Sequence, residues 1–162
     1  MSSSCMRYAR EFADLRKRMP EVGEPRVITV LMAKSRERYG IHALESVYSM
    51  LPAGGYEWVT NTGNENAAVH LRHAGRGCGA RTMADLYAAF GVVQVAGVKG
   101  LLQARFTDTF SAFKSQLAEF VTYLRTGAPA SLISARADGH HHRRDRKPKP
   151  RRARVQLKGV LS

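Results

Sequence analysis

The period of the hydrophobic positions changes along the chain, and each change predicts an element. Residues 26–33 are β-branched and almost wholly apolar, which is typical of a strand covered on both faces. Residues 8–18 predict a short helix that ends at the Pro and Gly residues of 20–25. A second helix is predicted before Pro52 from apolar residues at helical spacing, which are Ile41, Leu44, Tyr48 and Leu51.

After the second predicted helix, the sequence contains a series of short strand candidates. Clusters of Gly, Asn and Arg separate them, and brief turns between successive strands favour an antiparallel meander. The predicted strands are 56–62, 66–73, 79–84, 91–98 and 100–107, with a tight turn at 98–100 between the last two.

The strongest local pattern belongs to a final amphipathic helix. Asp108 or Thr109 can cap its start, Arg125 lies in its last turn, and Gly127 and Pro129 suit its end. One stripe carries its apolar residues, which are Phe110, Phe113, Leu117, Phe120, Val121 and Leu124. The whole order predicts an α+β fold in which helices pack on one face of a mostly antiparallel sheet.

Charge divides the chain into two parts. The formal net charge is +13, and residues 136–162 hold ten Lys/Arg and two Asp, so this basic tail carries +8 and the first 135 residues carry +5. We therefore expect a domain over 1–135 and a disordered tail over 136–162. The apolar content of the whole chain, 44%, is enough for one hydrophobic core.

Targeting and redox signals predict a cytoplasmic protein. Cys5 and Cys78 share no metal-ligand spacing, so we expect two reduced thiols. The N-terminus lacks the apolar core of a signal peptide, and no apolar run reaches the roughly 18 residues that span a membrane.

The candidate chemistry centres on a histidine in the second predicted helix. Glu45 and Ser46 follow His42 by three and four residues, so the three share one helix face. A histidine beside a carboxylate can serve as a general acid or base near neutral pH. Lys34 and Glu37 lie at the strand–helix junction, where site residues often collect. The alternative is that His42 is a structural or surface residue.

Three further patterns have weaker interpretations. Residues 75–80 carry glycines that superficially resemble a dinucleotide loop, but they open no helix and are more typical of a turn. Tyr56 and Trp58 alternate on a strand and could stack on a sugar ring or face the core. The histidines at 140–142 could bind a metal or could be incidental in a basic tail.

Several of these segments together resemble the C-terminal domain of the Gfo/Idh/MocA oxidoreductases, the family of inositol and glucose–fructose dehydrogenases. The resemblance covers residues 2–131, about four fifths of the chain. Its segments are Ser-Ser-Ser-Cys-Met-Arg-Tyr-Ala at 2–9, Tyr-Gly-Ile-His-Ala-Leu-Glu at 39–45, Val-Ala-Gly-Val-Lys-Gly at 95–100 and Phe-Val-Thr-Tyr-Leu-Arg-Thr-Gly-Ala-Pro at 120–129.

The resemblance implies a role for each residue of the candidate site. The family's acid/base histidine corresponds to His42, and Lys34, Tyr39 and Glu45 would bind the substrate, a sugar or polyol. Many members carry an aspartate four residues before the histidine, where this chain has Arg38. The family's lysine motif and its glycine-rich nucleotide loop belong to a dinucleotide-binding domain that these residues do not resemble.

The same resemblance predicts what the chain can do by itself. The family transfers hydride with NAD(P), so a chain without the nucleotide domain should bind no cofactor and should be inactive alone. The sheet would serve as the surface of a homo-oligomer.

The tail leaves two interpretations open. Moved forward by one base, codons for residues 138–149 can read Met-Val-Ile-Ile-Ile-Ala-Gly-Ile-Glu-Ser-Arg, an apolar helix of the kind the family has there, so the tail could be a frameshift product. Taken at face value, an Arg/Lys-rich arm could make the chain a small nucleic-acid-binding or structural association protein.

Overall fold

The structure is a computed structural model of the 162-residue chain, and it describes residues 4–34, 36–51, 56–62, 67–73, 76–83, 88, 90–127 and 154–156. Side chains at 36–37, 56, 67, 76–83 and 154–156 lie outside the description, although the backbone there is described.

Seven strands form one mixed sheet in the described part of the chain, in the order β6-β5-β1-β4-β3-β2-β7. The strands pair antiparallel except for β1 and β4, which run parallel. Their bounds are β1 Pro25–Ala33, β2 Tyr56–Thr62, β3 Ala67–His73, β4 Arg76–Met83, β5 Val92–Gly97, β6 Gly100–Arg105 and β7 Arg154–Gln156.

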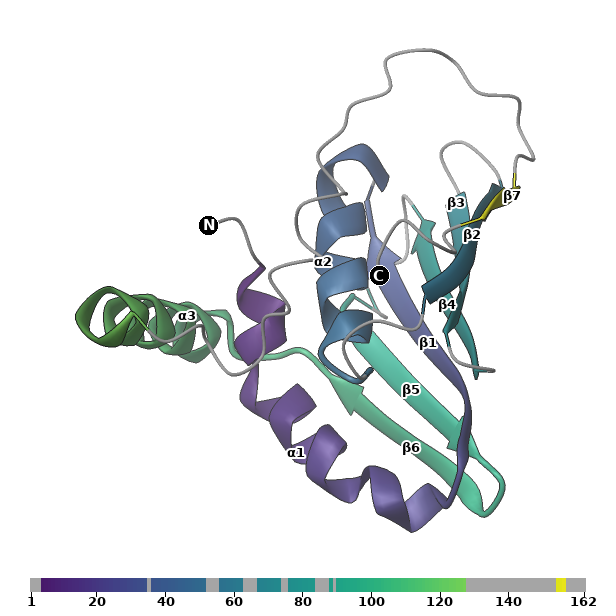
Figure 1. The fold of residues 1–162 in the computed structure, drawn as a ribbon, viewed down its shortest axis with the longest axis horizontal. Helices are drawn as coiled ribbons and strands as arrows, with labels where there is room; N and C mark the ends of the chain where they lie inside the picture. The colour runs from purple at the N-terminus through teal and green to yellow at the C-terminus, as the bar shows by residue number, and fades with distance from the viewer. Residues whose placement is uncertain are drawn as a thin grey trace.

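Helices cover one face of this sheet, and Figure 1 shows the arrangement. The short 3-10 helix η1 (Cys5–Tyr8) leads into α1 (Arg10–Arg18), which lies against β6, and η2 (Met19–Val22) follows it. Helix α2 (Arg36–Tyr48) packs on β1 and β4. Helix α3 (Thr109–Thr126) contacts η1 and extends away from the sheet.

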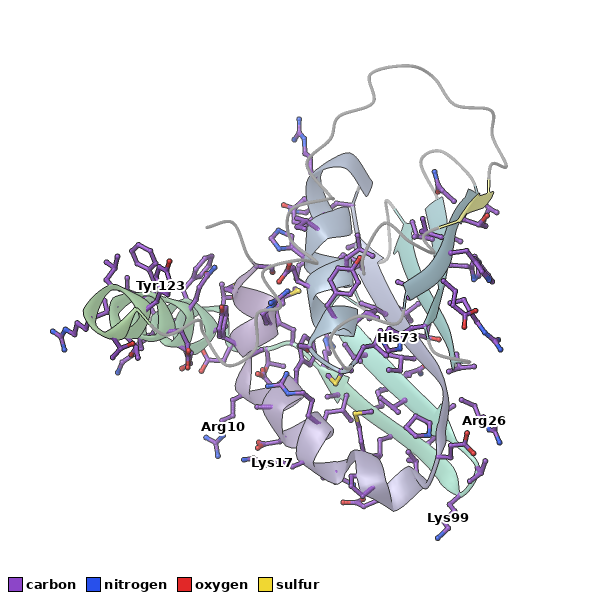
Figure 2. The ribbon with its side chains drawn as sticks, viewed as in Figure 1. Arg10, Lys17, Arg26, His73, Lys99 and Tyr123 are labelled. Atoms are coloured by element: carbon purple, nitrogen blue, oxygen red, sulfur yellow. The ribbon has the colours of Figure 1, made fainter. Side chains whose placement is uncertain are left out.

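The alternation along the strands explains which side the helices cover. Ile28, Val30 and Met32 of β1 are buried toward α2, together with Val93 and Val95 of β5. His73 continues this face on β3 and is 1% exposed, and Figure 2 shows it on the sheet beneath α2. Figure 2 also shows Arg10 and Lys17 pointing outward from α1, as an amphipathic helix requires.

Several predicted elements are confirmed closely. Strand β2 has the predicted bounds, and no end of β1, β3, β5, β6 or α1 differs from the prediction by more than two residues. Asp108 caps α3 by accepting a hydrogen bond from the Ser111 N–H at 2.9 Å, and Gly127 ends the helix in the left-handed region at φ 66°. The α+β fold with a largely antiparallel sheet is also confirmed.

The predicted meander is wrong in one respect. Strands β2, β3 and β4 do follow one another, but β1 inserts between β4 and β5 and pairs parallel to β4. Residues 76–80 of the glycine-rich stretch predicted as a turn are part of β4, where Gly77 and Gly79 pair with Val27 and Thr29 of β1. A strand buried between two neighbours can carry glycines because the ladder holds its backbone on both sides.

The prediction of a wholly disordered tail is corrected at one place. Residues 154–156 form β7, which pairs antiparallel with β2 at the edge of the sheet. The rest of the tail, including the histidines at 140–142, lies outside the described residues.

Helix α3 departs from the expected packing in a way that affects the surface. Ala112 is its one fully buried residue, and it lies near the start of the helix. The predicted apolar stripe is largely exposed, with Phe110 80% exposed and Leu117 62% exposed. Figure 2 shows Tyr123 on this helix, far from the sheet.

A carboxylate joins α1 to the start of α3. Glu11 Oε1 accepts hydrogen bonds from the Thr107 hydroxyl at 2.6 Å, the Thr107 N–H at 2.7 Å and the Asp108 N–H at 3.1 Å. Burial alone would raise the pKa of Glu11, but these hydrogen bonds outweigh it and lower the pKa. Any stability that Glu11 contributes is therefore present above the pKa of the unfolded chain and is lost as the pH falls through the lower folded value.

Candidate functional site

The site lies where β1 ends and α2 begins, the junction that the sequence singled out. Lys34 is the first residue after β1 and adopts φ 70°, in the left-handed region that residues other than glycine rarely occupy. Such a strained backbone persists only where the surrounding structure holds it, and it is often found at functional sites. Lys34 is also exposed, so its ammonium group can be reached from solvent.

Tyr39 of α2 brings the lysine toward the histidine. Lys34 Nζ donates a hydrogen bond to Tyr39 Oη at 2.9 Å and lies 4.7 Å from the centre of the tyrosine ring. The Tyr39 ring centre is 5.6 Å from that of His42, and its other neighbour is Phe90, whose ring meets it edge-on at 6.2 Å. Lys34, Tyr39 and His42 therefore form one continuous cluster, and Phe90 supports it.

His42 is held from its Nδ1 side by a residue near the start of the chain. Ser4 Oγ lies 2.7 Å from His42 Nδ1, although the two residues are 38 positions apart in the sequence. Ser46 Oγ donates to the His42 carbonyl oxygen at 2.9 Å, which fixes the backbone of the same turn. Burial lowers the pKa of His42 because the charged imidazolium loses hydration there.

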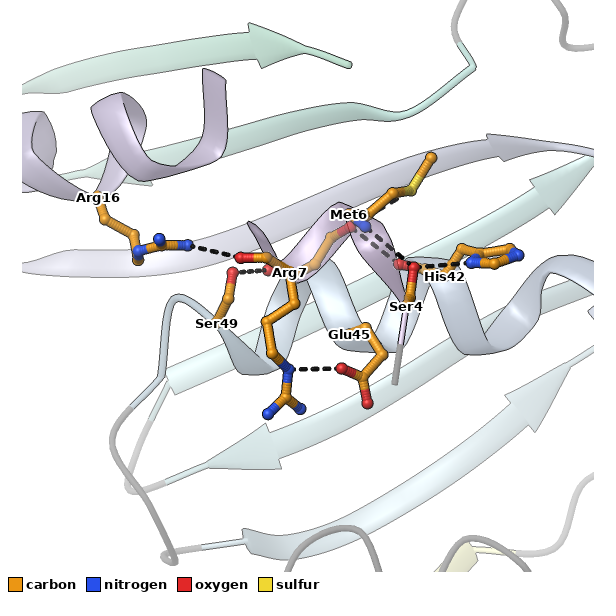
Figure 3. A network of polar contacts seen from close by, with 8 residues as sticks. Ser4, Met6, Arg7, Arg16, His42, Glu45 and Ser49 are labelled. Carbon is orange, nitrogen blue, oxygen red and sulfur yellow. Dashed lines mark hydrogen bonds and ion pairs between the residues drawn. The ribbon is translucent and has the colours of Figure 1, made fainter. Parts of the chain in front are cut away.

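Glu45 has a different environment from the one predicted for a substrate-binding residue. Its carboxylate forms an ion pair with Arg7, and both residues are 2% exposed. Figure 3 shows this pair beside Ser4 and His42, where η1 crosses α2. Glu45 thus joins η1 to α2, and the proposed ligand-binding cluster below consists of Lys34, Tyr39 and His42.

Further contacts stabilise the region where η1 crosses α2. Ser46 Oγ lies 3.8 Å from Met6 Sδ, and Ser49 Oγ donates to the Ser46 carbonyl at 2.8 Å. Burial raises the pKa of the neighbouring Cys5 thiol, which is free. That thiol is accordingly a packing group in its protonated form.

The other sequence candidates are exposed, lie on the opposite face of the sheet, or have side chains outside the described residues. Arg38 is exposed, and the side chain of Glu37 lies outside the described residues. The side chain of Tyr56 is also outside them. Trp58 is on the face of the sheet opposite the helices, because its neighbour Val59 pairs with the inward-facing Leu71.

Sequence reasoning missed Ser4 and Phe90. A serine before a short helical turn indicates a cap, and Ser4 does accept a hydrogen bond from the Met6 N–H at 3.2 Å. Its contact with His42 depends on the fold, which brings η1 across α2. Phe90 lies next to a tight turn at Gly91, and no local pattern connects it to Tyr39.

The described residues do not fit a bound dinucleotide. The glycine-rich stretch 75–80 contributes to β4, which pairs with β1 and β3, so it cannot form the strand–loop–helix turn that cradles a pyrophosphate. The β1–α2 junction holds Lys34 and no glycine motif. The part of the chain that the structure describes also has no group of three or more His, Cys, Asp or Glu that could hold a metal ion.

Within the described residues, no helix combines the length and the apolar character that crossing a membrane requires.

Comparison with solved structures shows the fold. The chain resembles a protein from Sinorhizobium meliloti assigned as a myo-inositol dehydrogenase, with a TM-score of 0.62 and 15% identity over 78% of this chain and 55% of that one. It also resembles Lactobacillus casei myo-inositol dehydrogenase solved with NAD(H) and myo-inositol, with a TM-score of 0.61 and 13% identity over 96% of this chain and 61% of that one.

A scyllo-inositol dehydrogenase from Lactobacillus casei is similar as well, with a TM-score of 0.58 and 11% identity over 80% of this chain and 55% of that one. The chain therefore spans 55 to 61% of the length of these three proteins. No protein-family model matches the sequence, and no curated protein matches it. The likeness is one of fold, shared with inositol dehydrogenases at low sequence identity.

Proposed function

We propose that residues 1–135 form the substrate-side domain of a Gfo/Idh/MocA-type oxidoreductase that acts on a sugar or polyol. The observation that supports this most is the cluster of Lys34, Tyr39 and His42 at the β1–α2 junction, on a fold shared with inositol dehydrogenases. One of those relatives was solved with myo-inositol. The basic tail has no part in this proposal.

The three side chains suit a ligand rich in hydroxyl groups. The Lys34 ammonium group and the Tyr39 hydroxyl can hydrogen-bond to neighbouring hydroxyls, and the Tyr39 ring offers a flat apolar surface to the C–H face of a sugar ring. His42 is the group that would contact the reacting oxygen. Its partly buried setting keeps the imidazole neutral near pH 7, because burial lowers its pKa.

Redox chemistry needs more than these residues. A nicotinamide must be positioned against the substrate carbon, and the described residues contain no dinucleotide loop. We therefore propose that NAD(P) is held by a separate dinucleotide-binding domain. The 162-residue chain should show no NAD(P)-dependent turnover of polyols by itself.

A binding titration tests the proposed site without requiring turnover. We expect myo-inositol to bind the full chain with a Kd of about 1 mM or weaker, corresponding to about 4 kcal/mol of binding energy or less. The shifted NMR signals should include those of His42 and Tyr39. His42→Ala and Lys34→Ala should each weaken binding by about tenfold, the effect of losing one or two hydrogen bonds to a polar ligand.

The matched control is His70→Ala. His70 is an exposed histidine on β3 whose side chain lies on the face of the sheet opposite the helices, so its removal should leave the titration unchanged. If myo-inositol and other polyols cause no saturable shifts, or if His42→Ala binds as well as the unaltered chain, the proposal is wrong.

The open face of the sheet supports a second part of the proposal, a homo-oligomer. The alternation that buries Ile28 and Val95 places Val27 and Leu101 on the opposite face, where they are 43% and 60% exposed. Gln94 and Gln103 on the same face are joined by a 2.8 Å hydrogen bond. This face carries both apolar and polar side chains, and the described helices pack on the opposite face, so a second copy can pack here.

Sedimentation velocity tests the oligomer. We expect the full chain to be a dimer at about 50 μM and the Val27→Glu variant to be a monomer, because a charge buried in an interface weakens it by several kcal/mol. Val98→Glu is the control, since Val98 lies on the β5–β6 turn and is 58% exposed. A monomeric unaltered chain, or a dimer that Leu117→Glu on α3 dissociates and Val27→Glu does not, would contradict a sheet-mediated interface.

A further inference from the structure

The hydrogen-bond partner of His42 is an uncharged hydroxyl and not a carboxylate. Nothing acidic faces its Nδ1 among the described residues: Ser4 Oγ occupies that position at 2.7 Å. The residue four positions earlier is Arg38, which is exposed, and Glu45 on the next turn is engaged by Arg7. Tyr39 lies against the ring of His42, and Lys34 donates a hydrogen bond to Tyr39.

The two hydrogen-bond partners of Ser4 Oγ determine in which bond it donates and in which it accepts. Ser4 Oγ accepts from the Met6 N–H at 3.2 Å, which leaves its single proton to donate elsewhere. Ser4 is only 3% exposed, and the one acceptor that the described residues place against it is His42 Nδ1. A buried hydroxyl donates where an acceptor is available, because an unused donor costs free energy. Ser4 therefore donates to Nδ1.

The protonation of the imidazole follows from this direction. In a neutral imidazole one nitrogen accepts and the other carries the proton, so an accepting Nδ1 requires the proton on Nε2. Figure 3 shows the second ring nitrogen of His42 on the side turned away from Ser4. A carboxylate in the place of Ser4 would have produced the opposite tautomer, with the proton on Nδ1 and a lone pair on Nε2.

We propose that Ser4 is a positioning residue that holds His42 neutral with its proton on Nε2, so that the site presents an N–H donor to a ligand oxygen. This deepens the proposed function, on which it rests for the nature of the ligand. A fixed donor favours an oxygen that only accepts, so the carbonyl form of a sugar or polyol should bind better than the hydroxyl form. The tautomer itself does not depend on any ligand.

Nitrogen NMR of the full chain tests the tautomer directly. In ligand-free protein at pH 8, we expect His42 Nε2 to resonate as a protonated imidazole nitrogen and Nδ1 as an unprotonated one. Ser4→Ala should mix the two tautomers and raise the pKa of His42 by about 0.5 to 1 pH unit, which is the contribution of one hydrogen bond to the neutral form. Ser4→Thr keeps a hydroxyl and should restore the original signals.

Ser49→Ala controls for the loss of a buried serine. Ser49 is 8% exposed and donates to the Ser46 carbonyl without touching His42, so this variant should keep the tautomer and the pKa. A proton on Nδ1 in the unaltered chain would overturn the proposal, as would a Ser4→Ala chain with an unchanged tautomer and pKa. Because these readouts need no ligand, they can succeed or fail independently of the inositol titration.

Discussion

Replacing Arg7 with methionine should lower the free energy of unfolding by about 3 to 5 kcal/mol, a large fraction of the stability of a domain of this size. Arg7 and Glu45 form an ion pair in which both residues are 2% exposed. Removing the guanidinium takes away the positive charge that lies against a buried carboxylate. Glu45→Gln should have a comparable cost, and urea unfolding followed by circular dichroism measures both.

Two further variants distinguish the effect of burying the two charges from the effect of pairing them. The double variant Arg7→Met/Glu45→Leu should recover most of the lost stability, since an apolar pair of similar volume often replaces a buried ion pair without loss. Arg18→Met breaks the exposed pair with Glu21, whose atoms are 3.0 Å apart, and should leave the midpoint of urea unfolding unchanged, because water screens that pair. A cost below about 1 kcal/mol for Arg7→Met would show that the buried pair contributes little.

The same crossing connects stability to the candidate site. Arg7 follows Ser4 by three residues, and Glu45 follows His42 by three, so the ion pair and the Ser4–His42 hydrogen bond join the same two segments. The ion pair fixes where η1 lies on α2, and that placement brings the Ser4 hydroxyl to Nδ1. A variant that loses the pair but stays folded should therefore also lose the single tautomer of His42.

The sequence predicts the local elements well because their signals are local. The apolar run of β1 and the caps of α3 depend on a few neighbouring residues, and the strand and the caps are both confirmed. The expected cover on both faces of β1 is wrong, because its buried residues alternate and Val27 is 43% exposed. Helical spacing likewise places Tyr39 and His42 on one face of α2, because they are three residues apart. The roles of Lys34 and Tyr39 in the site came from the family resemblance and stay a prediction.

The features that the sequence could not predict depend on contacts between distant segments. One such feature is the parallel pairing of β1 with β4, which places Val27 beside Gly77. A glycine-rich stretch can form a turn or lie within a strand, and the local sequence does not distinguish the two. Ser4 and Arg7 reach α2 only because η1 crosses it. The apolar stripe of α3 also shows this limit. Its amphipathic pattern predicts the helix correctly but does not determine which other segment covers its apolar side chains.

Truncating Phe12 to alanine should cost about 3 to 5 kcal/mol of unfolding free energy, the usual range for emptying a buried phenylalanine site. Phe12 of α1 is fully buried, and its ring centre lies 6.2 Å from that of Phe106, which follows β6. Phe106 is itself confined, because its Cβ would lie 2.7 Å from a Cβ added at Gly91. The surroundings therefore have little freedom to fill the cavity, and thermal or urea unfolding should show the full loss.

Phe110→Ala provides the matched control, since it makes the same chemical change on α3 at a residue that is 80% exposed. It should change stability by no more than about 0.5 kcal/mol. Phe12→Leu should cost about 1 to 1.5 kcal/mol and keep the Nε2 tautomer of His42, because α1 stays in place and continues to hold the segment that carries Ser4. Similar losses in Phe12→Ala and Phe110→Ala would contradict the packing of α1 against β6 and, with it, the placement of Ser4 and Arg7 on α2.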